Sequence, residues 1–260
     1  MQIDSIDVAY HYYHKSPKTG SNNETHIKAL PYLSVVQSKI GSYGISLDGG
    51  AETLTGEGNF FIAPSICTQK IRHIPNCENI FCARFIFLDV VINKKYRFDD
   101  IFELPLTTSG EVSSLLSEDF DKYESADCIC DRMSCIYGII KHLIGISREK
   151  KIYRTDKVYP LIEYIRANYS ENITVAQMAE ILNVSQSHLF GIFEKATGTS
   201  PVRYLNDYRL SIASDLLRRT NKSIKEISER VGIGDQFYFS KLFKAKYDLS
   251  PQKYRNEEKL

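Results

Sequence analysis

The residue types that could bind a metal ion are poorly spaced for that chemistry. None of the six histidines forms a His-X-His pair, and His11 and His14 would meet only across one turn of helix. The cysteines contain no Cys-X-X-Cys pair; they are Cys67, Cys77, Cys82, Cys128, Cys130 and Cys135. We therefore expect reduced, partly buried thiols in preference to redox or metal sensing.

Motifs for other kinds of catalysis are missing too. The sequence has no Gly-X-Ser-X-Gly word, no phosphate-binding loop and no dinucleotide-binding glycine pattern. It also lacks the roughly 18 consecutive apolar residues of a membrane helix and the layout of a secretion signal. We predict a cytoplasmic protein that is not an enzyme, with no catalytic residue, metal or cofactor and no membrane contact.

Positive charge is concentrated toward the C-terminal end. The net charge of the whole chain is +1, but residues 200–255 hold 12 Lys and Arg against 6 Asp and Glu, a local excess of +6. The chain has 260 residues, 43% of them hydrophobic, which is enough for two domains. A basic second domain suits a polyanion such as nucleic acid, although solvated helix faces also carry lysine.

The basic region repeats itself at a shift of 50 residues. Phe193 corresponds to Phe243, and the Ser-Pro pair at 200–201 corresponds to the pair at 250–251. Farther upstream the shift is 49, because one residue is added to a turn, where "NVSQ" becomes "GIGDQ". The repeat therefore predicts one structural unit that occurs twice.

Each copy predicts two short helices joined by a tight turn. Matching start and turn signals occur in both copies: capping boxes at Thr174 with Gln177 and Ser223 with Glu226, turn residues Asn183 and Gly232, and helix caps Ser185 and Asp235. This arrangement is a helix-turn-helix, whose second helix enters the DNA major groove.

Serine followed by proline predicts the start of the next helix in each copy, since a missing N–H costs nothing at the first helical position. The helix from Pro201 to Thr220 would be roughly 30 Å long. Successive major-groove faces on one side of B-DNA lie roughly 34 Å apart. We therefore predict two reading helices held by one long helix, with an all-helical interaction module as the alternative.

Residues from about Val158 to Arg255 closely resemble the DNA-binding domain of AraC-type (AraC/XylS) transcription regulators. The words that carry the resemblance are "MAEILNVSQSHLFGIFEKATGTSPVRYLNDYRL" and "VGIGDQFYFSKLFKAKYDLSPQKYR". It implies seven helices, two of them recognition helices bridged by a long one, and binding to double-stranded promoter DNA. It further implies activation through RNA polymerase more often than repression.

Carried over position by position, the resemblance places the recognition helices at Ser185–Ala196 and Asp235–Lys246. The implied base-facing residues are Gln186, Ser187, Phe190, Gly191, Gln236, Phe237, Ser240 and Lys241. Glutamine can pair with adenine and lysine with guanine or a phosphate. Phe190 and Gly191 depart from the family pattern, in which these positions are commonly polar or Arg. A phenylalanine can contact a thymine methyl but glycine reads nothing, so DNA shape could share the readout by the first helix. The expected phosphate contacts are Arg203, Arg209, Lys222, Lys244 and Lys253, although each alone could be a solvated charge.

The first half of the chain predicts many short strands. Residues 30–105 are rich in branched and aromatic residues, as in "FCARFIFLDVVI", and are divided by glycine-rich turns. This pattern is typical of a small antiparallel barrel or jelly roll. By resemblance it is a cupin-like effector barrel, to which "GEGNFFIAP" is similar. Either a ligand pocket or a core filled by side chains fits, and the sequence does not indicate ligand-binding residues.

Two apolar stripes within residues 111–145 predict a helix pair, which in this family commonly dimerises. The predicted fold class is α+β: a cupin-like barrel with a two-helix appendage, then an all-α domain with two helix-turn-helix motifs bridged by a long helix. The predicted divisions are a sensor and dimerisation domain at 1–145, a linker at 146–156 and a DNA-binding domain at 157–256.

These predictions together describe a sequence-specific transcription regulator. We expect an effector-responsive activator that binds promoter DNA, contacts RNA polymerase, forms a homodimer and senses an unknown small molecule. Two alternatives remain open for the first domain. It could be a barrel enzyme fused to a DNA-binding domain, or a dimerisation domain that binds no ligand.

Overall fold

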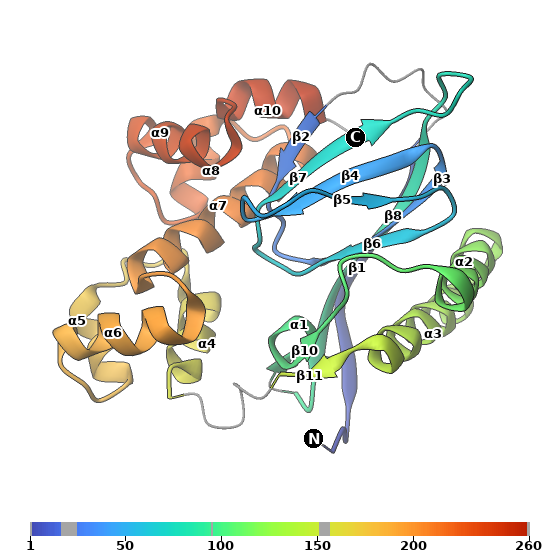
Figure 1. Cartoon of the computed structure of the whole chain (residues 1–260). Coiled ribbons are helices and arrows are strands. Elements are labelled where there is room, and N and C mark those ends of the chain that lie inside the picture. The colour runs from blue at the N-terminus through green and yellow to red at the C-terminus, as the bar shows by residue number, and fades with distance from the viewer. Residues whose placement is uncertain (1, 17–24, 95, 151–156, 259–260) are drawn as a thin grey trace. The chain divides into compact units, whose positions relative to one another are not determined.

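The computed structural model describes residues 2–16, 25–94, 96–150 and 157–258, which fall into two compact units (Figure 1). Unit 1 comprises Met1–Lys28 and Tyr32–Lys150, and unit 2 comprises Ala29–Pro31 and Lys151–Leu260. Unit 1 is rich in strands, and the described part of unit 2 is helical, so the predicted α+β class is confirmed. Part of the predicted linker, residues 151–156, lies outside the described residues.

Unit 1 contains two antiparallel sheets, of strand order β1-β8-β3-β6, with β9 paired to β8, and β2-β7-β4-β5. Their strands are β1 Ile6–Lys15, β2 Thr25–Lys28, β3 Leu33–Ile40, β4 Ser42–Leu47, β5 Thr53–Thr55, β6 Phe60–Ala63, β7 Gln69–Ile74, β8 Cys82–Ile92 and β9 Tyr96–Arg97. A separate two-stranded sheet pairs β10 (Phe102–Glu103) with β11 (Arg148–Glu149). Residues 148–149, within the predicted linker, are therefore paired to unit 1.

Alternation along the strands divides the core of unit 1 into two layers. Val35 of β3 and Phe60 of β6 face α2 and α3, whereas their neighbours Val36 and Phe61 face the second sheet. In the first sheet Val35 pairs with Ile86 and Ile62 on the strands at either side, so apolar side chains lie next to one another across three strands.

Aromatic side chains fill the space between the two sheets. Tyr43 packs edge to face on Phe81 and Phe61, with ring centroids 4.9 and 5.1 Å apart, and all three rings are buried. The sequence left open whether the space between the sheets is a ligand pocket or a core filled by side chains. Around Tyr43 the described residues show a filled core. The cupin-like character of the barrel stays a prediction.

Three helices complete unit 1: α1 (Phe98–Ile101), α2 (Gly110–Ser125) and α3 (Ile129–Ile146). The last two lie side by side (Figure 1), as the two apolar stripes predict. Phe120 of α2 meets Phe60 of the first sheet at 5.2 Å between centroids, and Ile136 and Ile140 of α3 are buried in the same core. Among the described residues, no helix has both the length and the apolar character that a membrane span requires.

The described part of unit 2 contains seven helices, the number implied by the resemblance. They are α4 Tyr159–Asn168, α5 Val175–Ile181, α6 Gln186–Thr197, α7 Pro201–Arg219, α8 Ile224–Arg230, α9 Gln236–Tyr247 and α10 Pro251–Glu258. The sequence repeat returns as repeated packing: Leu189 and Phe193 of α6 correspond to Phe239 and Phe243 of α9, and all four side chains are fully buried. Val202 in the first turn of α7 is 39% exposed, whereas Leu205, three residues further on, is buried in the core of this unit.

Candidate nucleic-acid interface

Helices α5 and α6 form the first helix-turn-helix. At the start of α5 the Gln177 backbone N–H donates to Thr174 Oγ1 (3.2 Å) and the Thr174 N–H donates to Gln177 Oε1 (2.8 Å), which confirms the predicted capping box. Asn183 in the turn has φ of 52°. Ser185 caps α6 by accepting a hydrogen bond from the His188 N–H at 3.2 Å. Because these interactions satisfy backbone donors that the helix leaves unpaired, they fix where α6 begins.

Helices α8 and α9 form the second helix-turn-helix, with the second predicted capping box, Ser223 with Glu226, also present. Gly232 in the turn has φ of +77°, and a Cβ atom there would lie 2.6 Å from the Ser170 carbonyl oxygen. Glycine is thus required twice, by the left-handed backbone and by the close approach of the backbone that follows α4. These two requirements explain why a glycine stands at position 232 in the turn.

The N-terminus of α9 is held by a double cap. Asp235 Oδ1 accepts hydrogen bonds from the backbone N–H groups of Phe237 (2.8 Å) and Tyr238 (3.0 Å). A carboxylate at this place also complements the positive end of the helix dipole. The backbone of the first turn of α9 is consequently fixed, while the side chains of Gln236, Phe237 and Tyr238 are exposed.

The Ser-Pro words act as helix starts in both copies. Ser200 Oγ accepts from the Arg203 N–H and Ser250 Oγ from the Lys253 N–H, each at 3.3 Å, and a proline opens the helix that follows. This prediction is confirmed. As a consequence, α7 begins at a defined residue just after α6, and α10 begins at a defined residue just after α9.

All four positions assigned to DNA on α6 are exposed: Gln186, Ser187, Phe190 and Gly191. Ser187 and Gly191 lie one turn apart on the face of α6 opposite Leu189 and Phe193, Phe190 lies beside them, and Gln186 stands at the helix start. A Cβ atom at Gly191 would meet no heavy atom within 4 Å, so the space in front of this position is open. The helix therefore presents a polar end at Gln186 and a nearly flat patch at Gly191.

The positions assigned to DNA on α9 differ in exposure and in free hydrogen-bonding capacity. Gln236 and Lys241 are exposed, and Phe237 is 88% exposed. Ser240 is half-buried, and its hydroxyl donates to the Gln236 carbonyl oxygen at 2.8 Å. The serine hydroxyl is thus engaged by its own helix and keeps only acceptor capacity for a base.

Burial separates the proposed phosphate contacts into two kinds. Arg203, Lys244 and Lys253 are exposed and Lys222 is half-buried, which leaves all four able to meet a ligand. Arg209 is a correction: it is 8% exposed, and its Nε and Nη2 atoms donate to the carbonyl oxygens of Tyr169 (2.7 Å) and Glu171 (2.6 Å). Burial also lowers the pKa of this guanidinium. Its role is to hold the segment after α4 and not to bind phosphate.

Sequence reasoning did not single out three exposed residues of the second motif. Lys225 and Arg230 lie exposed on α8, and Tyr238 is 50% exposed beside Phe237 on α9. The sequence could have indicated that Tyr238 is exposed, because it lies in the first turn after the predicted helix cap Asp235. Side chains in a first turn have no preceding turn of the helix to cover.

A family profile described as a helix-turn-helix domain matches residues 178–257. The lactose operon transcription activator of Staphylococcus xylosus is 39% identical over 95 residues, which are 36% of this chain and 34% of the activator. Residues 178–257 form an AraC-type helix-turn-helix domain. The matched region covers α5 through α10 almost completely, so it contains both helix-turn-helix motifs, α5 with α6 and α8 with α9.

Likeness outside the AraC-type domain is weaker. The uncharacterized regulator YisR of Bacillus subtilis is 35% identical over 171 residues, 62% of this chain and 60% of that protein. The chain spans between about a third and three fifths of the length of the curated relatives it matches. The crystal structure of ToxT from Vibrio cholerae is 12% identical, covers 95% of this chain and 98% of its own, and has a TM-score of 0.65. That likeness concerns the fold alone.

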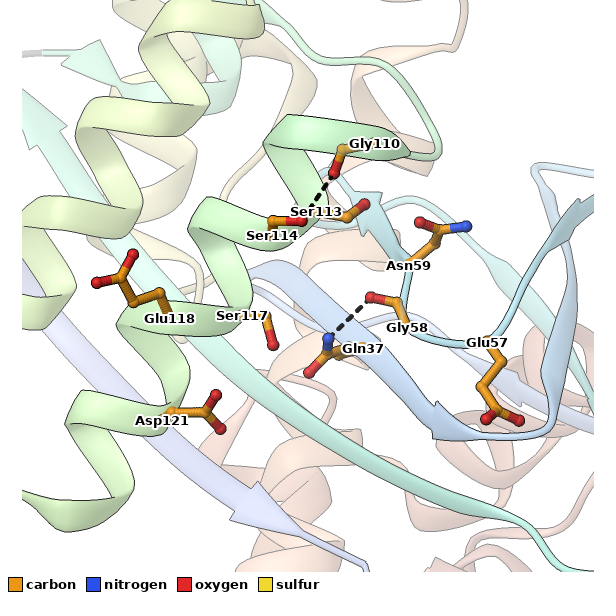
Figure 2. Close-up of a pocket in the computed structure, with 10 residues that line it drawn as sticks. All are labelled: Gln37, Glu57, Gly58, Asn59, Gly110, Ser113, Ser114, Ser117, Glu118 and Asp121. Atoms are coloured by element: carbon orange, nitrogen blue, oxygen red, sulfur yellow. Dashed lines mark hydrogen bonds between the residues drawn. The ribbon is translucent and has the colours of Figure 1, made fainter.

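Unit 1, apart from the AraC-type domain, has a polar cleft of about 480 Å³ between α2 and the turn from β5 to β6 (Figure 2). Its lining residues are Gln37, Glu57, Gly58, Asn59, Gly110, Ser113, Ser114, Ser117, Glu118 and Asp121. Every side chain among them carries a hydroxyl, amide or carboxylate group. Gln37 lies at the base of the cleft, where its Nε2 donates to the Gly58 carbonyl oxygen at 2.8 Å.

A buried arginine supports this cleft from below. Arg84 is 0% exposed; its Nε donates to Gln37 Oε1 (2.6 Å), and its Nη1 reaches Asp121 (2.6 Å) and Glu124 (2.7 Å). Partial burial alone would raise the pKa of Glu124. Hydrogen bonds from Lys15, Tyr13 and Arg84 outweigh that effect and lower the pKa to about 2. The ion network ties α2 to the first sheet.

The described residues contain no group of three or more His, Cys, Asp or Glu side chains placed to hold a metal ion. No disulfide joins the six cysteines, all of which lie within the described residues: Cys82 and Cys135 are buried, Cys67 is half-buried, and Cys77, Cys128 and Cys130 are exposed. The expectation of partly buried thiols therefore holds for half of them.

Proposed function

We propose that this protein is a sequence-specific DNA-binding regulator of transcription, with α6 and α9 as its recognition helices. Each of these helices has a capped N-terminus, one buried face packed on its own core and one exposed face with polar residues. The relatives that match the domain are named as transcription activators and regulators, which supports the same function. The observation that carries the proposal is that this capped and exposed helix occurs twice in one unit.

The length of α7 supports the use of both helices at once. Its 19 residues span about 28 Å at 1.5 Å per residue. This is close to the roughly 34 Å between successive major-groove faces on one side of B-DNA. We extend the proposal to an arrangement in which α7 bridges the two motifs and α6 and α9 enter consecutive major grooves of one duplex.

The direct test measures binding of the full chain to a duplex from the DNA upstream of its own gene. We expect affinity to fall steeply between about 50 and 200 mM salt, because Arg203, Lys244 and Lys253 would release counterions from phosphates. A competitor duplex of scrambled sequence should bind more weakly at every salt concentration. An affinity that does not change with salt would contradict phosphate-driven binding.

Two substitutions on α9 test the placement of that helix. Gln236→Ala and Lys241→Ala should each weaken specific binding by about 1–3 kcal/mol, since each removes an exposed hydrogen-bonding side chain from the proposed base-facing surface. Gln252→Ala is the matched control, because Gln252 is also exposed but lies on α10. Thermal unfolding should be the same for all three. If both α9 variants bind the operator like the unchanged chain, α9 is not a recognition helix.

We also propose that the protein activates promoters in contact with RNA polymerase and forms a homodimer through unit 1. Support for the dimer comes from α3, where Ile129 is 61% exposed and Tyr137 is 43% exposed. Together with the half-buried Met133 they form a stripe at four-residue spacing along one side of the helix. Exposed apolar stripes of this kind mark protein interfaces.

The polar cleft of unit 1 is our candidate for the effector site. Its lining has no apolar and no cationic side chain, which favours a small molecule rich in hydroxyl or amino groups over an anion or a lipid. The test is a thermal-shift screen of the full chain with polyols and amines, because a bound ligand raises the melting temperature by mass action. Asn59→Ala should abolish the shift, whereas Leu54→Ala, outside the cleft, should retain it.

The two alternatives for unit 1 lead to different observations. A barrel enzyme would convert a cleft ligand to product during incubation. A domain that serves only dimerisation would show no ligand-dependent shift and the same DNA affinity with every compound.

A further inference from the structure

An exposed aromatic pair occupies the first turn of α9. Phe237 is 88% exposed, more than any other large hydrophobic side chain among the described residues, and Tyr238 beside it is 50% exposed. The double cap by Asp235 fixes the backbone that carries both rings. A phenylalanine held in water on a rigid helix gains no free energy from folding, so its ring is available to a partner.

The neighbours of Phe237 identify the kind of partner. Ser240 and Lys241 lie three and four residues further along α9 and share its face, and Lys244 lies one turn beyond. Gln236 precedes it at the helix start. Phe237 shares its face of α9 with lysine and serine, with glutamine before it, and such surroundings make a poor hot spot for a protein partner, because the centre of a protein interface is apolar and depleted of charge. The same surroundings suit the edge of a DNA base pair between phosphates.

Only one apolar group is displayed on base edges in the major groove, the C5-methyl of thymine. We propose that Phe237 recognises a thymine methyl group, so that the preferred site of α9 contains a thymine whose methyl contributes to affinity. This inference rests on the proposed function and goes beyond it by naming the base that one side chain selects. Tyr238, on the adjacent side of the first turn, adds aromatic surface next to the contact.

The test combines a change in the DNA with a change in the protein. A preferred duplex is first selected by the full chain from a randomised pool. Each thymine in it is then replaced singly by uracil, which removes the methyl and keeps the base pairing. We expect one position at which uracil weakens binding about fourfold, the effect of removing one buried methyl group. Kd is measured by fluorescence anisotropy at one fixed salt concentration.

Phe237→Ala should weaken binding to the thymine duplex and bind the thymine and uracil duplexes equally at that position, because the methyl has lost its partner. The variant should melt at the same temperature as the unchanged chain, since the side chain is 88% exposed. Phe190→Ala on α6 is the matched control. It should keep the fourfold difference at the position read by α9.

The outcomes separate this inference from the function on which it rests. If the full chain selects no sequence from the pool, the proposed function fails and the inference fails with it. If a sequence is selected but no thymine shows the difference, the inference alone is overturned. The same conclusion follows if Phe237→Ala keeps the full thymine preference.

Discussion

Arg203 and Arg209 lie six residues apart on α7 and differ in almost everything but chemical type. The side chain of Arg203 is 78% exposed and meets Asp207 at 3.7 Å, whereas Arg209 holds two carbonyl oxygens from a buried position. We predict that Arg209→Ala lowers the free energy of unfolding by about 2–4 kcal/mol, because a buried side chain loses its packing and two part-buried carbonyl acceptors lose their donor. Urea unfolding of the full chain measures the change.

Arg203→Ala should have the opposite effects, on DNA affinity and not on stability. Its free energy of unfolding should change by less than about 0.5 kcal/mol, as is usual for exposed side chains. Its DNA affinity should fall, and the slope of log affinity against log salt should become shallower by about 1. Arg203→Ala variants that unfold early, or Arg209→Ala variants with unchanged stability, would show that burial does not separate the two roles.

At the scale of elements, two glycines of the helix-turn-helix motifs predict opposite effects of the same substitution. Gly232→Ala should destabilise unit 2 by about 2–4 kcal/mol, because alanine at φ of +77° is strained and its Cβ would meet the Ser170 carbonyl at 2.6 Å. Gly191→Ala should stabilise by up to about 1 kcal/mol, since Gly191 lies inside α6 with open space around it. Urea unfolding of both variants checks the signs, and two equal effects would refute the argument.

Elements with local causes could be predicted from the sequence. The capping boxes, the left-handed turn residues and the Ser-Pro starts each involve residues within a few positions of one another, so short words were sufficient to place helices α5 to α10. Arg209 could not be predicted in this way, because its partners lie 38 and 40 residues away. The same holds for Arg84, whose partner Gln37 is 47 residues distant on another strand. Both arginines were indistinguishable in sequence from solvated charges.

The same limit applied to unit 1 as a whole. The strand β8 and the helices α2 and α3 could be predicted from the sequence, since their apolar residues recur with the period of a strand or of a helix. The polar cleft could not be predicted from the sequence, because its lining residues come from three separate segments of the chain: Gln37, the turn at Glu57–Asn59 and α2. No local sequence motif joins these segments. Tertiary packing alone places these polar side chains around one space.

At the scale of the whole molecule, an exposed surface of unit 1 leads to a prediction of the oligomeric state. Homodimers bury apolar surface, and Ile129 and Tyr137 on α3 are the exposed apolar residues of the helix pair best aligned for it. We predict a dimer by light scattering at micromolar concentration and a monomer for Ile129→Asp, because a buried unpaired carboxylate at such an interface is costly.

Leu54→Asp provides the matched control for this prediction. Leu54 is 63% exposed, as apolar as Ile129 and as accessible, but it lies on β5 in the second sheet. If Leu54→Asp dissociates the dimer and Ile129→Asp does not, the interface lies on the second sheet. When the prediction holds, Ile129→Asp should also weaken binding to a promoter with two sites, because loss of the dimer removes the high effective concentration of the second DNA-binding unit. Binding to a single site should stay unchanged.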